Sequence, residues 1–296
     1  MAKSQLDHAG RMRASDQSDN AGVGCRWVAD RRKEIVMMDG RGRTMHRREA
    51  LKMFASLALC PLCAPASYAA EHQHWGYTGE AGPDKWGGLE PADAPCSAGG
   101  QQSPIDITGT INARQPPLKI NWSKRPDTIV NNGHTIQLGF AEGDTLGFGD
   151  RTFALKQLHF HHPSEHLVEG KGFAMEAHFV HEGADGLAVV GVLMAAGKPN
   201  AVFRKIAATM PSEEGAPVPA DPSIDLSRLL PAQHTYFHYE GSLTTPPCSE
   251  TVDWIVLAHP IEVDEADIAR FGKLYPMNSR PVQKRDRRFI LSSSPR

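Results

Sequence analysis

The stretch LHFHHPSEH, residues 158–166, places four histidines in nine positions around a proline. Apolar and polar residues alternate up to His161, as is typical of a half-buried strand. Because alternate side chains of a strand share a face, His159 and His161 point the same way, while His162 points oppositely. The stretch therefore predicts a strand that carries a pair of imidazoles on one face.

A second strand is predicted at residues 173–181, FAMEAHFVH, a short connection away. It is the natural antiparallel neighbour of the first, and its His178 can supply a third nitrogen. Three neutral imidazoles suit zinc, and a set of three protein ligands leaves a position open, which marks a catalytic site. The competing interpretation of an H-x-H pattern is a solvated strand end.

Residues in phase with these histidines favour the metal site. Gln157 is in phase with His159 and Glu176 with His178, so each could accept the N–H of the nitrogen that does not bind metal. Three further histidines are not expected to be ligands, because one points to the other face, one follows the turn and one is out of phase: His162, His166 and His181.

The rest of the chain after the first 70 residues has the pattern of a mainly β protein. Short apolar runs separated by Gly, Pro, Asn and Asp predict strands within residues 128–140, 153–162, 173–182 and 187–197. Residues 200–210 and 264–275 predict helices that end before Pro211 and Pro276, the second capped by Asp264. Residues 211–223 have the composition of a surface loop. We expect a single mainly β (α+β) domain with a few peripheral helices.

The overall composition is that of an ordinary soluble protein. The 296 residues include 40% hydrophobic and 22% charged residues, and the formal net charge is -2. That balance argues against a nucleic-acid partner.

The N-terminal segment is interpreted as an export leader. Residues 45–69 combine Arg47 and Arg48, an apolar stretch from Met53 to Leu62 and small residues at a cleavage-compatible spacing. The arginine pair resembles a twin-arginine signal, with Sec export as the alternative. The apolar stretch is too short to span a bilayer comfortably, so no stable membrane anchor is expected after cleavage. Residues 1–44 are interpreted as a disordered upstream extension or a mis-assigned start.

The cysteines fit an exported domain. Three would leave with the N-terminal segment, and Cys96 and Cys248 would remain in residues 70–296. Two cysteines in an exported chain suggest one disulfide, and the alternative is a pair of buried thiols.

These residues resemble the alpha-class carbonic anhydrases, in particular the bacterial, exported members. The resemblance covers nearly all of the chain after the leader. Its motifs occur in family order: HWGY at 74–77, QQSPIDI at 101–107, NNGH at 131–134, QLHFH at 157–161, SEH at 164–166, EAHFV at 176–180, GLAVVGV at 186–192, GSLTTPPC at 241–248, DWIVL at 253–257 and NSRPVQ at 278–283.

The resemblance implies a fold and an activity. The fold is a large, twisted, mainly antiparallel sheet of about ten strands with zinc at the base of a cone-shaped cleft. The activity is the reversible hydration of carbon dioxide to bicarbonate and a proton, through attack by a zinc-bound hydroxide. The implied cofactor is one Zn²⁺ per chain, the only partner with a clear signal is the small-molecule substrate, and a homodimer is compatible with bacterial relatives.

The resemblance also assigns roles residue by residue. The zinc ligands match His159, His161 and His178; the pair that orients the hydroxide matches Thr244 and Glu165; and the proton shuttle matches His134. The carbon dioxide pocket matches Val180, Val189, Leu243 and Trp254. The water-ordering side of the cleft matches Tyr77, Asn132, Gln137 and Thr245, with Gln137 where many relatives have Asn. The single bacterial disulfide matches Cys96 and Cys248.

Two other functions are compatible with parts of this pattern. Some family members are non-catalytic binding modules that have lost zinc histidines, but this chain retains all three together with Thr244 and Glu165. A periplasmic zinc buffer is suggested by five extra histidines, namely His72, His74, His162, His166 and His181. More than one zinc per chain without hydration activity would favour the buffer.

Overall fold

The computed structural model describes residues 37–38, 44–45, 74–123 and 125–293. The chain divides into the units Met1–Ala70 and Glu71–Arg296. In the first unit, strands β1 (Met37–Met38) and β2 (Thr44–Met45) pair antiparallel. Apart from Met45, the export leader predicted at residues 45–69 lies outside the described residues, and so do the three N-terminal cysteines, Cys25, Cys60 and Cys63.

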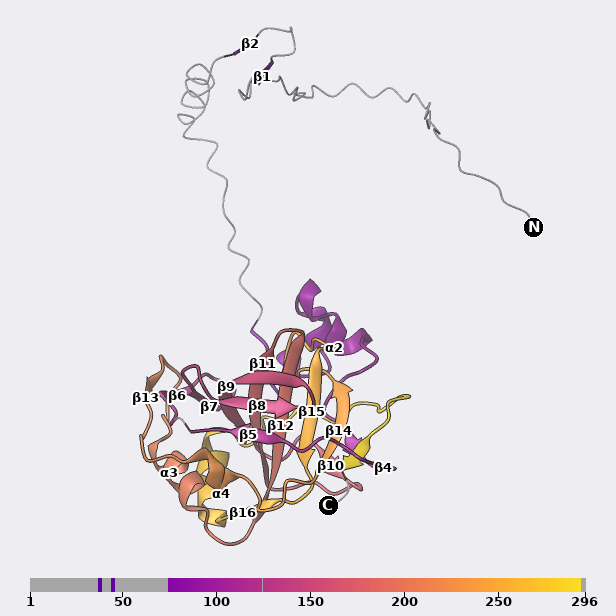
Figure 1. The fold of residues 1–296 in the computed structure, drawn as a ribbon. Helices are drawn as coiled ribbons and strands as arrows, with labels where there is room; N and C mark the ends of the chain where they lie inside the picture. Colours follow the sequence, from indigo (N-terminus) through magenta and orange to yellow (C-terminus); the bar gives the residue numbers. More distant parts are fainter. Residues whose placement is uncertain (1–36, 39–43, 46–73, 124, 294–296) are drawn as a thin grey trace, which may run out of the picture. The chain divides into compact units, whose positions relative to one another are not determined.

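The unit Glu71–Arg296 is built on one large mixed sheet, which confirms the predicted mainly β class (Figure 1). Thirteen strands join this sheet, and ten of them follow the order β13-β6-β7-β9-β11-β12-β15-β14-β17-β4. Most neighbours are antiparallel, whereas β12 pairs in parallel with β15 and β16, and β17 with β4. The count exceeds the ten implied by the resemblance because short segments join the sheet at its margins.

The strands have these bounds: β3 Asp106–Ile107, β4 Ile111–Ala113, β5 Lys119–Asn121, β6 Thr128–Asn131, β7 Ile136–Gly139, β8 Thr145–Phe148, β9 Arg151–His161, β10 Leu167–Val168, β11 Met175–Gly183, β12 Gly186–Ala196, β13 Val218–Pro219, β14 Tyr236–Gly241, β15 Val252–Leu257, β16 Ile261–Val263 and β17 Leu291–Ser293. The predicted strand at 128–140 is in fact the hairpin β6–β7, because Gly133 turns the chain at a φ of +85°. The predicted loop at 211–223 contains the short strand β13, paired with β6.

Both predicted helices are confirmed. Helix α3 (Ala201–Thr209) begins after Asn200, whose side chain accepts hydrogen bonds from two backbone N–H groups of the first turn. Helix α4 (Glu265–Leu274) is capped by Asp264, as predicted, through the N–H of Ala266. The remaining helical segments are short: η1 Gly79–Ala81, η2 Trp86–Gly88, η3 Pro91–Asp93, α2 Pro95–Ala98 and η4 Leu226–Leu229. Among the described residues, no helix combines the length and apolarity needed to cross a membrane.

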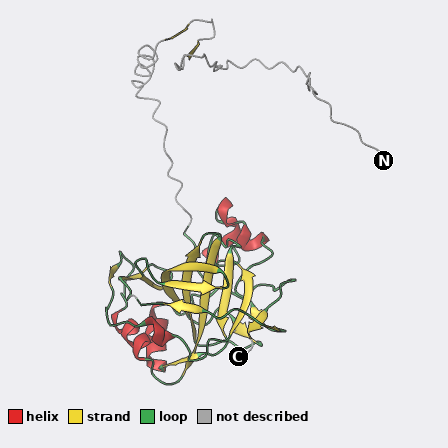
Figure 2. Cartoon of the chain, viewed as in Figure 1, coloured by secondary structure: helices red, strands yellow, loops and turns green. Residues whose placement is uncertain are grey.

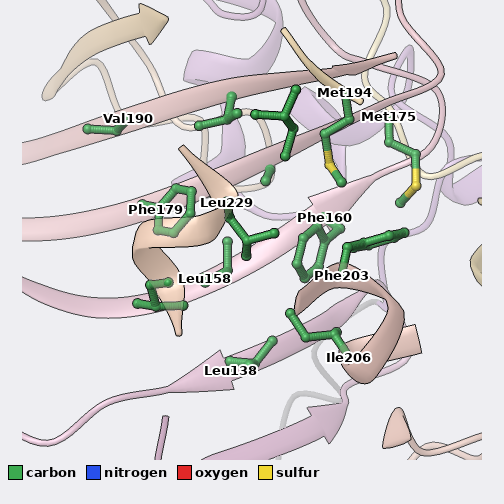
Figure 3. Packing of buried hydrophobic residues seen from close by; sticks show 14 of the residues in the cluster. Leu138, Leu158, Phe160, Met175, Phe179, Val190, Met194, Phe203, Ile206 and Leu229 are labelled. Carbon is green, nitrogen blue, oxygen red and sulfur yellow. The ribbon is translucent and has the colours of Figure 1, made fainter. Parts of the chain in front are cut away.

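The main hydrophobic core lies between the sheet and the pair α3 and α4 (Figures 2 and 3). On β9 the side chain of Phe160 is fully buried and packs edge-to-face against Phe203 of α3 and Phe271 of α4, with ring centroids 5.4 and 6.2 Å away. Strand alternation then places His159 and His161, the flanking residues, on the opposite face. The same strand therefore serves the core on one side and the histidine cluster on the other.

A bulge on β9 sets this alternation. Val180 of β11 pairs with Gln157, but His181 pairs with Leu155, so Lys156 has no partner in the ladder. Before the bulge Phe153 and Leu155 are buried, and after it the buried positions shift to Leu158 and Phe160. Such bulges re-aim side chains next to functional sites. Here the bulge directs Gln157, His159 and His161 together to the face away from the helices.

Candidate metal centre and cleft

The three predicted ligand histidines converge on one face of β9 and β11. His159 and His178 are direct partners in the antiparallel register, and His161 lies two residues further along β9. One nitrogen of each ring lies within 4.8 Å of one nitrogen of each of the others. His161 and His178 are 1% exposed, while His159 is partly exposed. The cluster is thus closed on the protein side and accessible through His159.

Hydrogen bonds leave one nitrogen of each ring available. His159 Nδ1 lies 2.7 Å from Gln157 Oε1, and His161 Nδ1 lies 2.8 Å from the Asn278 carbonyl oxygen. Both partners can only accept, so each Nδ1 carries the proton and each Nε2 has a lone pair. The Nε2 atom of His161 is buried and has no partner. An orphaned buried nitrogen of this kind needs a ligand, and zinc meets that need.

The third ring is held by a carboxylate. Glu176 Oε1 lies 2.9 Å from His178 Nε2 and 2.7 Å from His166 Nδ1. Its other oxygen accepts the backbone N–H groups of Glu165 and His166, at 3.0 and 2.9 Å. Glu176 is a partner of two imidazoles, whereas the sequence predicted only its contact with His178. The Nδ1 atom of His178 is left to face the cluster.

Electrostatics keep the three rings neutral. Burial is the main cause that lowers the pKa of His159 and His178, and it lowers the pKa of His161 to about 4. Neighbouring imidazoles in the cluster lower the pKa of His159 and His178 further. A neutral ring is the form that binds metal, so the site needs no proton release near pH 7.

The predicted pair Thr244 and Glu165 lies beside the cluster, and both residues are buried. Glu165 Oε1 accepts the backbone N–H of Arg280 at 2.8 Å, and Oε2 lies 3.9 Å from His178 Nδ1. Burial raises the pKa of Glu165 to about 7, against the opposing effects of His178, the Arg280 N–H and the Thr244 hydroxyl. The buried Oε2 atom of Glu165 has no hydrogen-bond partner.

The predicted apolar pocket residues form a row next to the histidine cluster. Val180 of β11 pairs with Val189 of β12, which pairs with Trp254 of β15. Val180 shares a face with His178 because the two are two positions apart on one strand. Leu243 packs against the same buried cluster, and the Trp254 indole N–H donates to the Ser242 carbonyl at 2.9 Å. The row gives the cluster an apolar wall.

His134 lies in the β6–β7 turn, half-buried and stacked on Trp75, with ring centroids 3.7 Å apart. His74 is also stacked near it at 5.0 Å. Burial lowers the pKa of His134, His74 lowers it further and Glu214 opposes them. An unperturbed imidazole titrates near neutral pH, and these surroundings shift the pKa of His134 below that ordinary value.

The four polar residues predicted to order water in the cleft do not share one kind of environment. Gln137 is the register partner of His159, so it lies next to the cluster on the same face. Burial, followed by the nearby charge of Glu165, raises the pKa of Tyr77 well above its usual value. The Asn132 amide oxygen accepts two backbone N–H groups of its own turn, and the Thr245 carbonyl accepts the Cys248 N–H at 2.9 Å. Asn132 and Thr245 thus have local structural contacts that the sequence did not predict.

Sequence reasoning left three contributors without a role. His166 is fully buried, and its Nε2 lies 2.6 Å from the Tyr239 hydroxyl, which donates to Ser103. Asn278 and Arg280 use backbone atoms to hold His161 and Glu165. The signal was present, since His166 lies in the SEH motif and the other two in NSRPVQ. Backbone contacts of a distant loop, however, have no residue-type signature.

The other predicted non-ligands lie away from the cluster. His162 contacts the Pro276 carbonyl through Nδ1 at 3.0 Å. His181 is buried on the core face of β11, stacked on Trp122 with its Nδ1 3.2 Å from the Ala188 carbonyl oxygen. The predicted disulfide between Cys96 and Cys248 is confirmed, with Cα atoms 5.0 Å apart. It links helix α2 to the loop that carries Thr244.

Comparisons with known proteins agree with this geometry. The family model of the eukaryotic-type carbonic anhydrases matches residues 81–294. Proteins named carbonic anhydrase from Nostoc sp. and Neisseria gonorrhoeae are 40% and 41% identical, and each match covers 84% of this chain and 98% of the relative. The solved alpha-carbonic anhydrase of Thermovibrio ammonificans, in complex with the inhibitor sulfanilamide, has a TM-score of 0.72 at 40% identity over 74% of this chain and 99% of that one.

Proposed function

This chain belongs to the alpha-type carbonic anhydrase family, and we propose that it catalyses the reversible hydration of carbon dioxide to bicarbonate and a proton. The proposal includes one zinc ion per chain, held by His159, His161 and His178. The observation that carries it is the convergence of three neutral imidazoles, each with one nitrogen fixed by an acceptor and the other turned inward.

When bound, zinc supplies a Lewis acid that lowers the pKa of a water at the open position to about 7, an effect for which carbonic anhydrase is itself the reference case. The chain's own residues orient the nucleophile. In its ionised form Glu165 can only accept hydrogen bonds, so the Thr244 hydroxyl hydrogen is then directed to it and the Thr244 oxygen is left to accept. The nucleophile derived from water would donate its hydrogen to the Thr244 oxygen. This hydrogen bond fixes its orientation, so that a lone pair faces the substrate.

His134 is the group proposed to carry the released proton. Its ring lies in a turn at the edge of the site, half-buried and held by stacking on Trp75. An imidazole whose ordinary pKa is near 6.5 accepts and releases protons readily near neutrality. It therefore takes the proton at a ring nitrogen and passes it to buffer.

The row of Val180, Val189 and Trp254, with Leu243, is the proposed binding wall for carbon dioxide. An apolar molecule gains nothing from polar partners, so an apolar surface next to the metal ligands favours its binding over that of water. Bicarbonate is charged and is not retained by such a wall.

We propose that the enzyme is exported to the periplasm or secreted. The Cys96–Cys248 disulfide supports an oxidising compartment. The leader at residues 45–69, the twin-arginine route and the homodimer remain predictions.

The zinc-buffer alternative finds little support in the described extra histidines. His166 has both ring nitrogens engaged, by Glu176 and Tyr239, and His181 lies in the hydrophobic core. His74 stacks on His134 and belongs to neither group of potential metal-binding side chains found among the described residues. The second such group, His166 with Glu176 and His178, shares His178 with the main cluster and is internally hydrogen-bonded.

The test is stopped-flow hydration of carbon dioxide by the zinc-loaded protein beside a chelated sample. We expect acceleration that depends on zinc at one zinc per chain. His161→Ala should lose both zinc and activity, because it removes a ligand. His162→Ala is the matched control, since it changes the adjacent histidine on the other face and should keep both. Stoichiometric zinc without any acceleration in the unmodified protein would reject the catalytic function.

A further inference from the structure

The loop between α3 and β13 is fastened to the turn that carries His134. The Asn131 side-chain amide donates to the Pro211 carbonyl at 3.2 Å, and the Gly215 backbone N–H donates to the Asn131 carbonyl at 3.1 Å. Beyond the loop, Val218 pairs with Ile129 of β6. Asn131 thus bonds the residues on either side of the segment 212–214. The side chains of that segment therefore have defined positions relative to the turn.

Glu214 is the residue of this segment that lies against the turn. Its carboxyl group sits on Gly133, where a Cβ atom would come within 2.9 Å of the carboxyl carbon. Gly133 has a φ of +85°, so the position is both conformationally reserved for glycine and sterically filled by Glu214. The neighbouring Glu213 is likewise exposed, but it is not among the groups that shift the pKa of His134.

The charge of Glu214 reaches two titratable groups. It opposes the lowering of the pKa of His134 that burial and His74 cause. It also contributes, after burial, to raising the pKa of Tyr275 to about 12. The Tyr275 hydroxyl in turn donates to Asn131, the same residue that fastens the loop. Glu214 is therefore the acidic group that acts on the His134 ring, and His74 opposes its effect.

We propose that Glu214 is a positioning residue for proton transfer, whose carboxylate stabilises the imidazolium form of His134 against the neighbouring His74. The proposal rests on the shuttle role of His134 in the proposed function. A carboxylate in this position makes His134 a better proton acceptor. It does so without touching the substrate, because it acts only through the His134 ring.

The experiment compares the zinc-loaded wild type with Glu214→Gln, which keeps the shape of the side chain and removes its charge, and with Glu213→Gln as the matched control. The titration midpoint of the His134 ring is followed by NMR. We expect the midpoint to fall in Glu214→Gln by about 0.2 to 0.7 pH unit, the range of an exposed charge pair. It should not move in Glu213→Gln. Hydration by Glu214→Gln should be slower in weak buffer, equal in strong buffer and restored by added imidazole.

The outcomes separate this proposal from the function on which it rests. Equal midpoints in all three proteins would overturn the role of Glu214. A lower midpoint in Glu214→Gln with wild-type hydration in weak buffer would equally overturn it, because the charge would then have no effect on proton transfer. Absence of hydration in the wild type would reject the proposed function, while the midpoints would still decide whether Glu214 acts on His134.

Discussion

The side chain of Glu176 fixes the protonation and orientation of the imidazole rings next to it. Glu176 accepts four hydrogen bonds, two from imidazoles and two from backbone N–H groups. Burial alone would raise the pKa of Glu176, but His166 and His178 hold it well below its usual value. The carboxylate therefore stays ionised, keeps the proton of His178 on Nε2 and leaves Nδ1 to face the histidine cluster. Gly191 makes room for it, since a Cβ there would lie 3.0 Å from Glu176 Oε1.

His181 offers a residue-level prediction about acid stability. Burial lowers its pKa to about 4 from 6.5, so the unfolded chain takes up this proton first. Stability is consequently lost as the pH falls from about 6.5 to 4, by about 2 kcal/mol between pH 6.5 and 4.5. In urea unfolding at these two pH values, His181→Phe should lose less stability than the wild type by about that amount. His259→Phe, at an exposed position, should retain the wild-type loss; an equal loss in all three proteins would contradict the prediction.

Individual elements position the site through irregular features as much as through regular ones. The bulge at Lys156 rotates the end of β9 so that its histidines leave the core face. The loop after β14 carries Leu243 and Thr244 and ends at Cys248, which adopts a φ of +55°. The disulfide and the bond from Gln102 to the Cys248 carbonyl, at 3.1 Å, attach that loop to the N-terminal part of the domain.

Loss of the disulfide should therefore destabilise the domain and loosen the loop. Cys96 and Cys248 are separated by 152 residues, and closing a loop of that length contributes about 3 to 5 kcal/mol in the chain-entropy model. The Cys96→Ser/Cys248→Ser variant should lose about this much free energy of unfolding, measured with denaturant. Hydration should also be slower, since Thr244 is less well held. The control is the wild type under reducing conditions, which should approach the variant; unchanged stability in both would refute this account.

Across the whole domain, the two faces of one sheet serve separate purposes. One face packs on α3 and α4 to form the main core, part of which Figure 3 shows. The other face holds the histidines and the apolar wall. The proposed zinc ligands come from β9 and β11, and the carbonyl that holds one of them comes from Asn278, far along the chain. A ligand that joins these parts is therefore expected to stabilise the entire fold.

Metal removal tests that expectation. A ligand that binds only the folded state, at a free concentration of 100 times its Kd, stabilises by about 2.7 kcal/mol. Zinc addition to the chelated protein should raise the denaturant midpoint by the corresponding amount, and chelation should reverse it. His162→Ala should respond to zinc like the wild type, and His161→Ala should not respond. A zinc response that survives in His161→Ala would place the ion elsewhere.

The sequence alone determined the β class, both helices, the phase of the histidines and the disulfide partners, because alternation, capping residues and cysteine number are local signals. The family resemblance supplied the site roles, since its motifs span the chain. Tertiary structure alone decided that His166 shares Glu176 with His178, that Asn278 and Arg280 serve through backbone atoms, and that Glu214 lies on the turn of His134. Those contacts join segments up to 117 residues apart. Local sequence patterns do not show which distant segments meet in the folded chain.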